Sequence, residues 1–191
     1  MPSQPGPAGG SSGEAAVRSE TVINVIQGDF AISDRDGDVL VTLLGSCVAT
    51  CLFDPVARVG GLNHFLLPAG SDNPRQSVRY GAHAMELLIN GLLRRGANRH
   101  RLKGKLFGGA RMVDGLSDIG AANSLFARDF LAKEGIECVG SSLGGVQARK
   151  IRFVPTTGAA RQMLVERQAV EAVERAPRRP RPPPEDDITL F

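Results

Sequence analysis

The stretch VLVTLLGSCVATCLFDPVARVGGLNHFLLP, residues 39–68, decides how this chain folds. It holds two apolar runs separated by an Asp-Pro turn signal, a pattern that is typical of an antiparallel β-hairpin. We expect one strand over residues 47–53, a four-residue turn over 54–57 and a return strand over 58–67. Residues 58–67 should therefore lie beside residues 47–53.

This register places Cys47 directly opposite His64. Side chains of opposed residues share one face, with Cβ atoms roughly 4.5–5.5 Å apart, so an imidazole there can take a thiol proton. A bulge at Pro55 or at the Gly60-Gly61 pair would shift the register by one residue and separate the two side chains. The residues alone also allow a second interpretation, in which Cys47 is a small buried residue and His64 a hydrogen-bonded core histidine.

The segments around the hairpin alternate between strand and helix patterns. Their order favours an α/β fold, a layered sandwich with a β-sheet core of several antiparallel strands flanked by helices. We expect strands at 21–26, 30–33, 39–44, 103–107, 136–141 and 149–155, and helices at 79–95, 119–134 and 159–175.

The composition predicts one domain. Residues 1–19 predict a disordered N-terminal tail, residues 20–165 the folded domain, and residues 166–191 a C-terminal tail that is helical at first and then Pro/Arg-rich and flexible. Three cysteines without a signal-peptide pattern predict reduced thiols in a cytoplasm. The sequence contains no apolar run of about 18 residues, so it predicts no membrane insertion. A net charge of +3 does not indicate nucleic-acid binding.

Cysteine and histidine side chains are also zinc ligands, so a metal site is another possible interpretation of these residues. In an extended strand Cys47 and Cys51 are about 13 Å apart, too far for both thiolates to reach one ion. We therefore expect no metal and no cofactor, with Cys51 and Cys138 as packing residues on apolar strands.

Three further blocks accompany the hairpin: residues 105–110, residues 118–126 and residues 143–153. Together with Thr42-Leu43-Leu44-Gly45-Ser46-Cys47 and Gly60-Gly61-Leu62-Asn63-His64, they make the chain resemble the CheD family of chemoreceptor glutamine deamidases over about residues 20–165. The resemblance implies that Cys47 is the nucleophile, His64 the base and Thr42 the third site residue. It also implies two partners: the cytoplasmic helices of methyl-accepting chemotaxis receptors as substrate, and a CheC-type phosphatase.

The implied reaction converts receptor glutamine to glutamate with release of ammonia. A primary carboxamide is a poor electrophile, so forming a Cys47 thioester first divides one difficult hydrolysis into two easier steps. We expect backbone N–H groups of residues 45–47 to hold the oxyanion, because Gly45 permits an unusual turn there. We interpret the basic run over residues 94–105 as a solvated surface. If it lies beside the site, it would help to dock the acidic receptor helices that the resemblance implies.

Two other functions stay open on the sequence. One is a non-catalytic chemotaxis adaptor, which would work without a cysteine nucleophile. The other is a different Cys/His acyl-transfer enzyme, of the peptidase or transglutaminase type.

Overall fold

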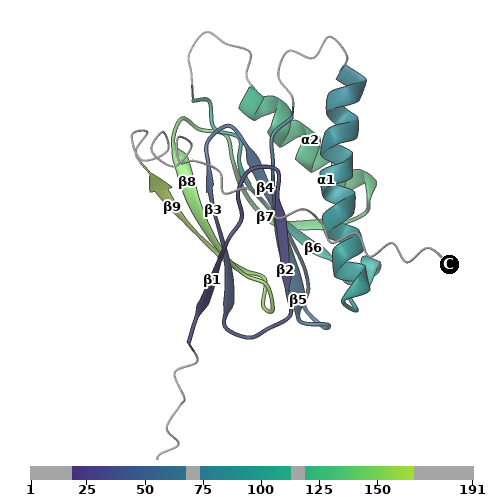
Figure 1. Ribbon diagram of the computed structural model, residues 1–191. Coiled ribbons are helices and arrows are strands. Elements are labelled where there is room, and N and C mark those ends of the chain that lie inside the picture. Colours follow the sequence, from purple (N-terminus) through teal and green to yellow (C-terminus); the bar gives the residue numbers. More distant parts are fainter. Residues whose placement is uncertain (1–18, 68–73, 113–118, 166–191) are drawn as a thin grey trace, which may run out of the picture.

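The computed structural model describes residues 19–67, 74–112 and 119–165 (Figure 1). The expected tails at 1–19 and 166–191 lie outside these residues, apart from residue 19. Along the described chain the elements are β1 (Thr21–Asn24), β2 (Phe30–Ser33), β3 (Asp38–Leu44), β4 (Val48–Asp54), β5 (Val59–Phe65), α1 (Pro74–Arg94), the 3-10 turn η1 (Arg99–Arg101), β6 (Lys103–Gly108), α2 (Ile119–Lys133), β7 (Glu137–Leu143), β8 (Ala148–Val154) and β9 (Ala159–Val165).

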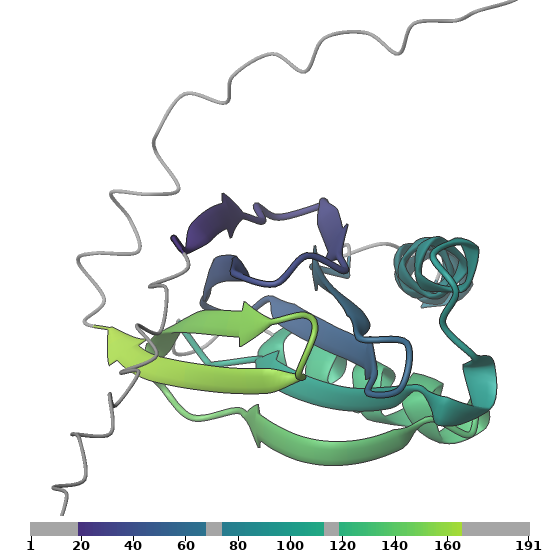
Figure 2. The ribbon, with the colours of Figure 1, turned by 90° about the horizontal axis from the view of Figure 1, so that it is seen from below.

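The strands form two sheets, and both helices lie on the outer side of one of them (Figures 1 and 2). Sheet A has the order β1-β3-β8-β9, and sheet B has the order β2-β5-β4-β6-β7. Most neighbouring strands are antiparallel, whereas β1 with β3 and β6 with β7 are parallel. The expected α/β layered sandwich is confirmed.

Strand β4 is the centre of sheet B and is buried on both faces. Alternate side chains enter two different cores, because successive residues of a strand point to opposite faces. Cys51 and Phe53 face sheet A, while Val48 and Leu52 face the helices. A strand covered on both sides needs mostly apolar residues, which explains why only Thr50 and Asp54 are polar in β4.

The β4–β5 hairpin forms, but its register differs from the expected one by two residues. Ala49 lies opposite His64, and Asp54 still pairs with Val59, so the turn is Pro55–Arg58. The cause is Asp54: its side chain accepts hydrogen bonds from two turn N–H groups, which keeps it at the end of the strand. An even shift preserves the face, so Cys47 and His64 still belong to the same side of sheet B.

Two other expectations are wrong. The helix expected from residue 159 is a strand up to residue 165, because β9 pairs with β8 along its whole length after a turn at Gly158. Cross-strand pairing there outweighs helical spacing. Cys138 is exposed on β7, the edge strand of sheet B, and is no packing residue.

Within the described residues, neither helix is both long enough and apolar enough to cross a bilayer.

Candidate active site

Cys47 ends a short loop, residues 45–47, that links sheet A to sheet B. All three carbonyl groups of the loop accept hydrogen bonds from the β6–α2 side: from Ala110 N–H at 2.9 Å, from Asn123 Nδ2 at 3.0 Å and from Gly109 N–H at 2.7 Å. In a trans peptide the N–H points away from the carbonyl of the same unit. The N–H groups of Ser46 and Cys47 are thus directed away from β6.

Gly108 lets the backbone of β6 come this close. Its φ is 112°, and a Cβ there would lie 2.2 Å from the Cys47 carbonyl oxygen. No side chain fits at that distance, so the glycine is required by the contact. The Gly108-Gly109 pair thus serves close backbone approach, and it helps to fix the loop that carries Cys47.

His64 lies on β5 and points across the gap between the sheets to Thr42 on β3. Thr42 Oγ1 donates to the Val25 carbonyl at 2.7 Å, and it lies 2.8 Å from His64 Nδ1. A hydroxyl has one proton, and this one is used on Val25. Thr42 therefore accepts from His64 Nδ1–H, so that a neutral His64 ring carries its lone pair on Nε2.

That lone pair has no hydrogen-bond partner among the described residues. Burial is the main reason why the pKa of His64 falls from 6.5 to about 4, with a smaller opposing effect from the Val25 carbonyl and the charge of Asp29. The imidazole is neutral at pH 7 as a result. A neutral, buried imidazole with an unused acceptor atom can serve chemically as a proton acceptor.

Cys47 and His64 are diagonal neighbours, since Cys47 stands two residues before Ala49, the partner of His64. Such neighbours lie roughly 7–8 Å apart at the backbone, within reach of an imidazole side chain. Asn63 and Phe65 point the other way: Asn63 bonds to the Ala84 carbonyl, and Phe65 packs edge-on against Phe126. Both residues therefore face away from His64, as the alternation of side chains along a strand requires.

Gln27 is a site residue that sequence reasoning missed. The Cys47 thiol donates to its Oε1 atom at 3.3 Å. Gln27 lies in the turn after β1, and nothing in the local pattern of that turn indicates a contact with Cys47, 20 residues away. Only the packing of β1 beside β3 brings the two together.

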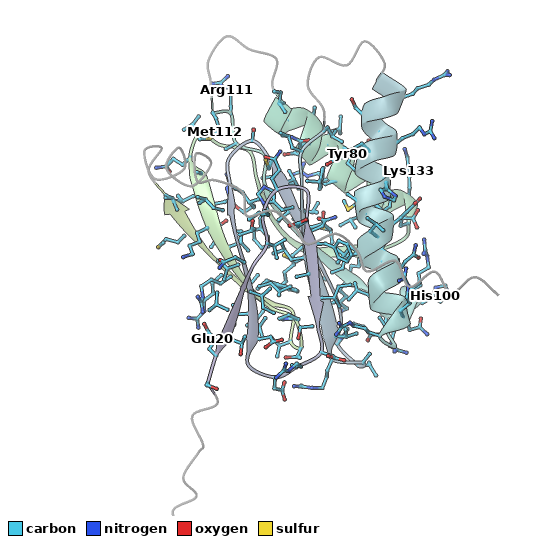
Figure 3. All side chains as sticks on the ribbon, viewed as in Figure 1. Glu20, Tyr80, His100, Arg111, Met112 and Lys133 are labelled. Atoms are coloured by element: carbon cyan, nitrogen blue, oxygen red, sulfur yellow. The ribbon has the colours of Figure 1, made fainter. Side chains whose placement is uncertain are left out.

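The other cysteines and histidines lie apart from this arrangement. Cys51 is fully buried, and burial raises the pKa of its thiol strongly, with a smaller opposing effect from Lys105. Cys138 and His83 are exposed on β7 and α1. His100 lies in η1, toward the opposite end of the molecule from Arg111 and Met112 (Figure 3).

The basic run at 94–105 is not beside Cys47. Arg101 pairs with Asp54 at the far end of β4, roughly 20 Å from the cysteine. A different basic surface lies nearer: a groove of about 480 Å³ between α2 and the β7–β8 loop, which contains Arg111 and Arg128. Gly109, which bonds to the Cys47 carbonyl, lines the same groove.

Comparison with known proteins now places this chain. A family model described as CheD chemotactic sensory transduction matches residues 66–163. A Caulobacter vibrioides protein is 51% identical over 179 residues, covering 88% of this chain and 92% of the relative. The chain belongs to the CheD family.

Other CheD relatives give the same result. A Cereibacter sphaeroides protein is 54% identical over 143 residues, covering 75% of this chain and 72% of its own. A Rhizobium etli protein is 47% identical over 175 residues, covering 88% of this chain and 95% of the relative. All three relatives carry the name probable chemoreceptor glutamine deamidase CheD.

Two solved structures are also similar. The Bacillus licheniformis hypothetical protein YfiH is 16% identical with a TM-score of 0.42, covering 65% of this chain and 60% of its own. A Neisseria meningitidis protein of the DUF152 family model is 12% identical with a TM-score of 0.41, and the match covers 66% of this chain and 63% of that protein.

Proposed function

We propose that this protein is a chemoreceptor glutamine deamidase, a hydrolase that converts selected glutamine side chains of chemotaxis receptors to glutamate. The names of its CheD relatives support the reaction. The observation that carries the mechanism is the His64 ring: Thr42 holds Nδ1–H, and Nε2 is left with a buried lone pair on the face that Cys47 shares.

In the first half of the reaction, His64 Nε2 takes the proton of the Cys47 thiol and Sγ attacks the carboxamide carbon of the substrate glutamine. The tetrahedral intermediate collapses as imidazolium returns its proton to the amide nitrogen, the C–N bond breaks and ammonia leaves. A thioester to Cys47 remains.

In the second half, His64 removes a proton from water, and the resulting hydroxide attacks the thioester carbon. The C–S bond breaks, the thiolate of Cys47 regains the proton, and a glutamate side chain is released. The sum is glutamine plus water giving glutamate plus ammonia, which requires no oxidant, metal or cofactor.

Thr42 acts by orienting the base. Its hydroxyl accepts from Nδ1–H while donating to Val25, so the ring cannot turn or change tautomer without breaking a buried hydrogen bond. A fixed tautomer leaves Nε2 as the proton acceptor throughout the cycle.

The N–H groups of Ser46 and Cys47 are our candidates for the oxyanion hole. The carbonyls of the loop are held by Ala110, Asn123 and Gly109, so its N–H groups are already oriented before substrate binds. Dipoles that need no reorganisation stabilise a developing negative charge most effectively.

The receptor helix is proposed to dock along the groove that contains Arg111 and Arg128. Positive side chains there complement the acidic helices that the family resemblance implies, and Gly109 connects the groove to Cys47. Arg128→Glu should raise KM for receptor several-fold with kcat unchanged, whereas Arg94→Glu on α1 should not. Equal KM values for the two variants would remove the groove from the proposal. A CheC-type phosphatase, the second implied partner, is tested by co-elution of the two purified proteins.

The test of the proposed function is direct. The purified protein is incubated with receptor cytoplasmic fragments, ammonia is measured, and mass spectrometry maps glutamines that have become glutamate. Cys47→Ala should abolish both signals, and Cys51→Ala, the same change at a fully buried cysteine on β4, should keep them apart from a loss of stability. Deamidation by Cys47→Ala would overturn the mechanism.

The same assay separates the two alternatives. A transglutaminase would incorporate an added primary amine in place of water, and a peptidase would cut the receptor chain. An adaptor would support chemotaxis as well with Cys47→Ala as with the wild type.

A further inference from the structure

Gln27 presents a carboxamide to the thiol of Cys47. The residue is exposed, yet its side chain reaches the buried cysteine, whose Sγ donates to Oε1 at 3.3 Å. Among the described residues this is the only hydrogen bond of the Gln27 side chain. A glutamine side chain thus lies on the nucleophile of a protein that we propose acts on glutamine side chains.

The backbone under Gln27 is held firmly against the base. Gly28 N–H donates to the His64 carbonyl at 2.7 Å, and His64 N–H donates to the Asp29 carbonyl at 3.0 Å. Asp29 N–H closes the turn on the Ile26 carbonyl at 3.1 Å. With the turn fixed, the Gln27 side chain can leave Cys47 by rotating its own χ angles, without moving His64.

The contact decides where the thiol proton is. A thiol has one proton, and here it is directed to Gln27 Oε1 while His64 Nε2 has no partner in the described part of the chain. A neutral imidazole and a protonated thiol define the resting site. For catalysis the proton has to move from the Gln27 side to the His64 side.

We propose that Gln27 is a placeholder for the substrate: its carboxamide occupies the position of the substrate carboxamide on Cys47, and a receptor glutamine displaces it when it binds. Displacement frees the thiol proton for His64, so the nucleophile is activated when substrate arrives and is protected from oxidants and electrophiles before then. This inference rests on the proposed function, whose substrate has the same side chain as Gln27.

Alkylation of Cys47 by iodoacetamide at pH 7 tests the contact without any receptor. Gln27→Ala should react about two- to tenfold faster than the wild type, the factor expected for losing one neutral hydrogen bond. Gln27→Met, which is of similar length but lacks the carboxamide, should be about as fast. Gln27→Glu should be slower than the wild type and need a higher pH, because a carboxylate beside Sγ opposes the thiolate. Gln162→Ala, an exposed glutamine on β9, is the matched control and should not change the rate.

Three outcomes would overturn the proposal. Unchanged alkylation in Gln27→Ala would show that the contact does not restrain the thiol. Fast reaction in Gln27→Ala with a wild-type rate in Gln27→Met would show simple steric cover by any long side chain. A fall in kcat for receptor deamidation by Gln27→Ala, with KM unchanged, would make Gln27 part of the chemistry itself. The placeholder predicts a lower KM by about the same two- to tenfold factor and an unchanged kcat.

Failure of this inference is distinguishable from failure of the proposed function. If wild-type protein deamidates receptors but the Gln27 variants alkylate at the wild-type rate, only the placeholder is wrong. If the variants alkylate as expected but wild-type protein releases no ammonia from receptors, the deamidase function is wrong, and Gln27 restrains the thiol without standing in for a substrate glutamine.

Discussion

The two ends of the β4–β5 hairpin each bury an ionisable group, and the two groups differ in how fully they are hydrogen-bonded. Near the turn, the Asp54 carboxylate is fully buried and accepts bonds from three backbone N–H groups and from Arg101. Near the other end, His64 is also buried, but its Nε2 atom has no partner in the described chain.

The pKa values reflect this difference. Burial alone would raise the pKa of Asp54, but its hydrogen bonds from Arg101, Asn98, Ala57 and Val56 outweigh burial and lower the pKa well below the usual range. For His64 burial is the largest effect and its bonds offset only part of it. A buried charge whose bonds are all satisfied stabilises a turn, whereas a buried base with an unused lone pair costs stability and is available for chemistry.

The largest effect is expected from removing that base. His64→Ala should lower kcat for receptor deamidation by about 10²- to 10⁴-fold, the usual contribution of general acid–base catalysis. Alkylation of Cys47 should persist at high pH, where the thiol ionises without help. The measurement is steady-state ammonia release together with a pH series of alkylation.

His83→Ala is the matched control, because His83 is exposed on α1 and should not affect turnover. A wild-type rate in His64→Ala would show that the unused lone pair of His64 has no catalytic role, and the contrast with Asp54 would then have no functional meaning.

The next effect concerns the residue that orients the base. Thr42→Val keeps the shape but removes the acceptor of His64 Nδ1–H, leaving a buried donor unsatisfied at a cost of about 1–3 kcal/mol. If that cost falls on the transition state, kcat should drop by about 5- to 150-fold. Thr42→Ser restores the hydroxyl and should recover most of the rate. A Thr42→Ser variant as slow as Thr42→Val would point to packing of the methyl group instead of the hydrogen bond.

The face shared by Cys47 and His64 could be predicted from sequence, and the missing parts have different causes. Strand alternation gave the correct face for Cys47 and His64, because a slip by two residues keeps the face. The slip itself came from the Asp54 side chain, which accepts hydrogen bonds from two N–H groups of its own turn and stays in the strand, a local interaction that the expected turn over residues 54–57 did not include. Gln27 was missed because only the pairing of β1 with β3 brings it to Cys47. Thr42 was named by family resemblance, and spacing alone gave no reason to pair it with His64.

At the other end of the hairpin we expect a loss of stability and no loss of chemistry. Asp54→Ala removes the acceptor of the Val56, Ala57 and Asn98 N–H groups, and it leaves Arg101 unpaired. Because Arg101 is 40% exposed, water recovers part of the ion-pair energy, and the free energy of unfolding should fall by about 2–4 kcal/mol. Urea unfolding measures this loss. Folded Asp54→Ala should alkylate Cys47 and deamidate receptors at the wild-type rate per folded molecule; a large loss of kcat would mean that the two ends are coupled.

The smallest expected effect is a difference between the two buried groups in how they make the free energy of unfolding depend on pH. The pKa of His64 is about 4 when folded and about 6.5 when unfolded, so between these values the unfolded chain binds more protons and the free energy of unfolding rises with pH. The titration of His64 should thus change stability little above about pH 6.5 and lower it by about 2 kcal/mol on going from pH 7 to pH 5. Asp54, whose folded pKa is lowered, contributes stability that is lost only below its unfolded pKa of about 3.9. Urea unfolding from pH 7 to pH 5 should therefore show a slope in the wild type and in Asp54→Asn, and a smaller slope in His64→Gln, which is uncharged at every pH. If His64→Gln keeps the full wild-type slope, another group titrates in that window and His64 is not held neutral by burial.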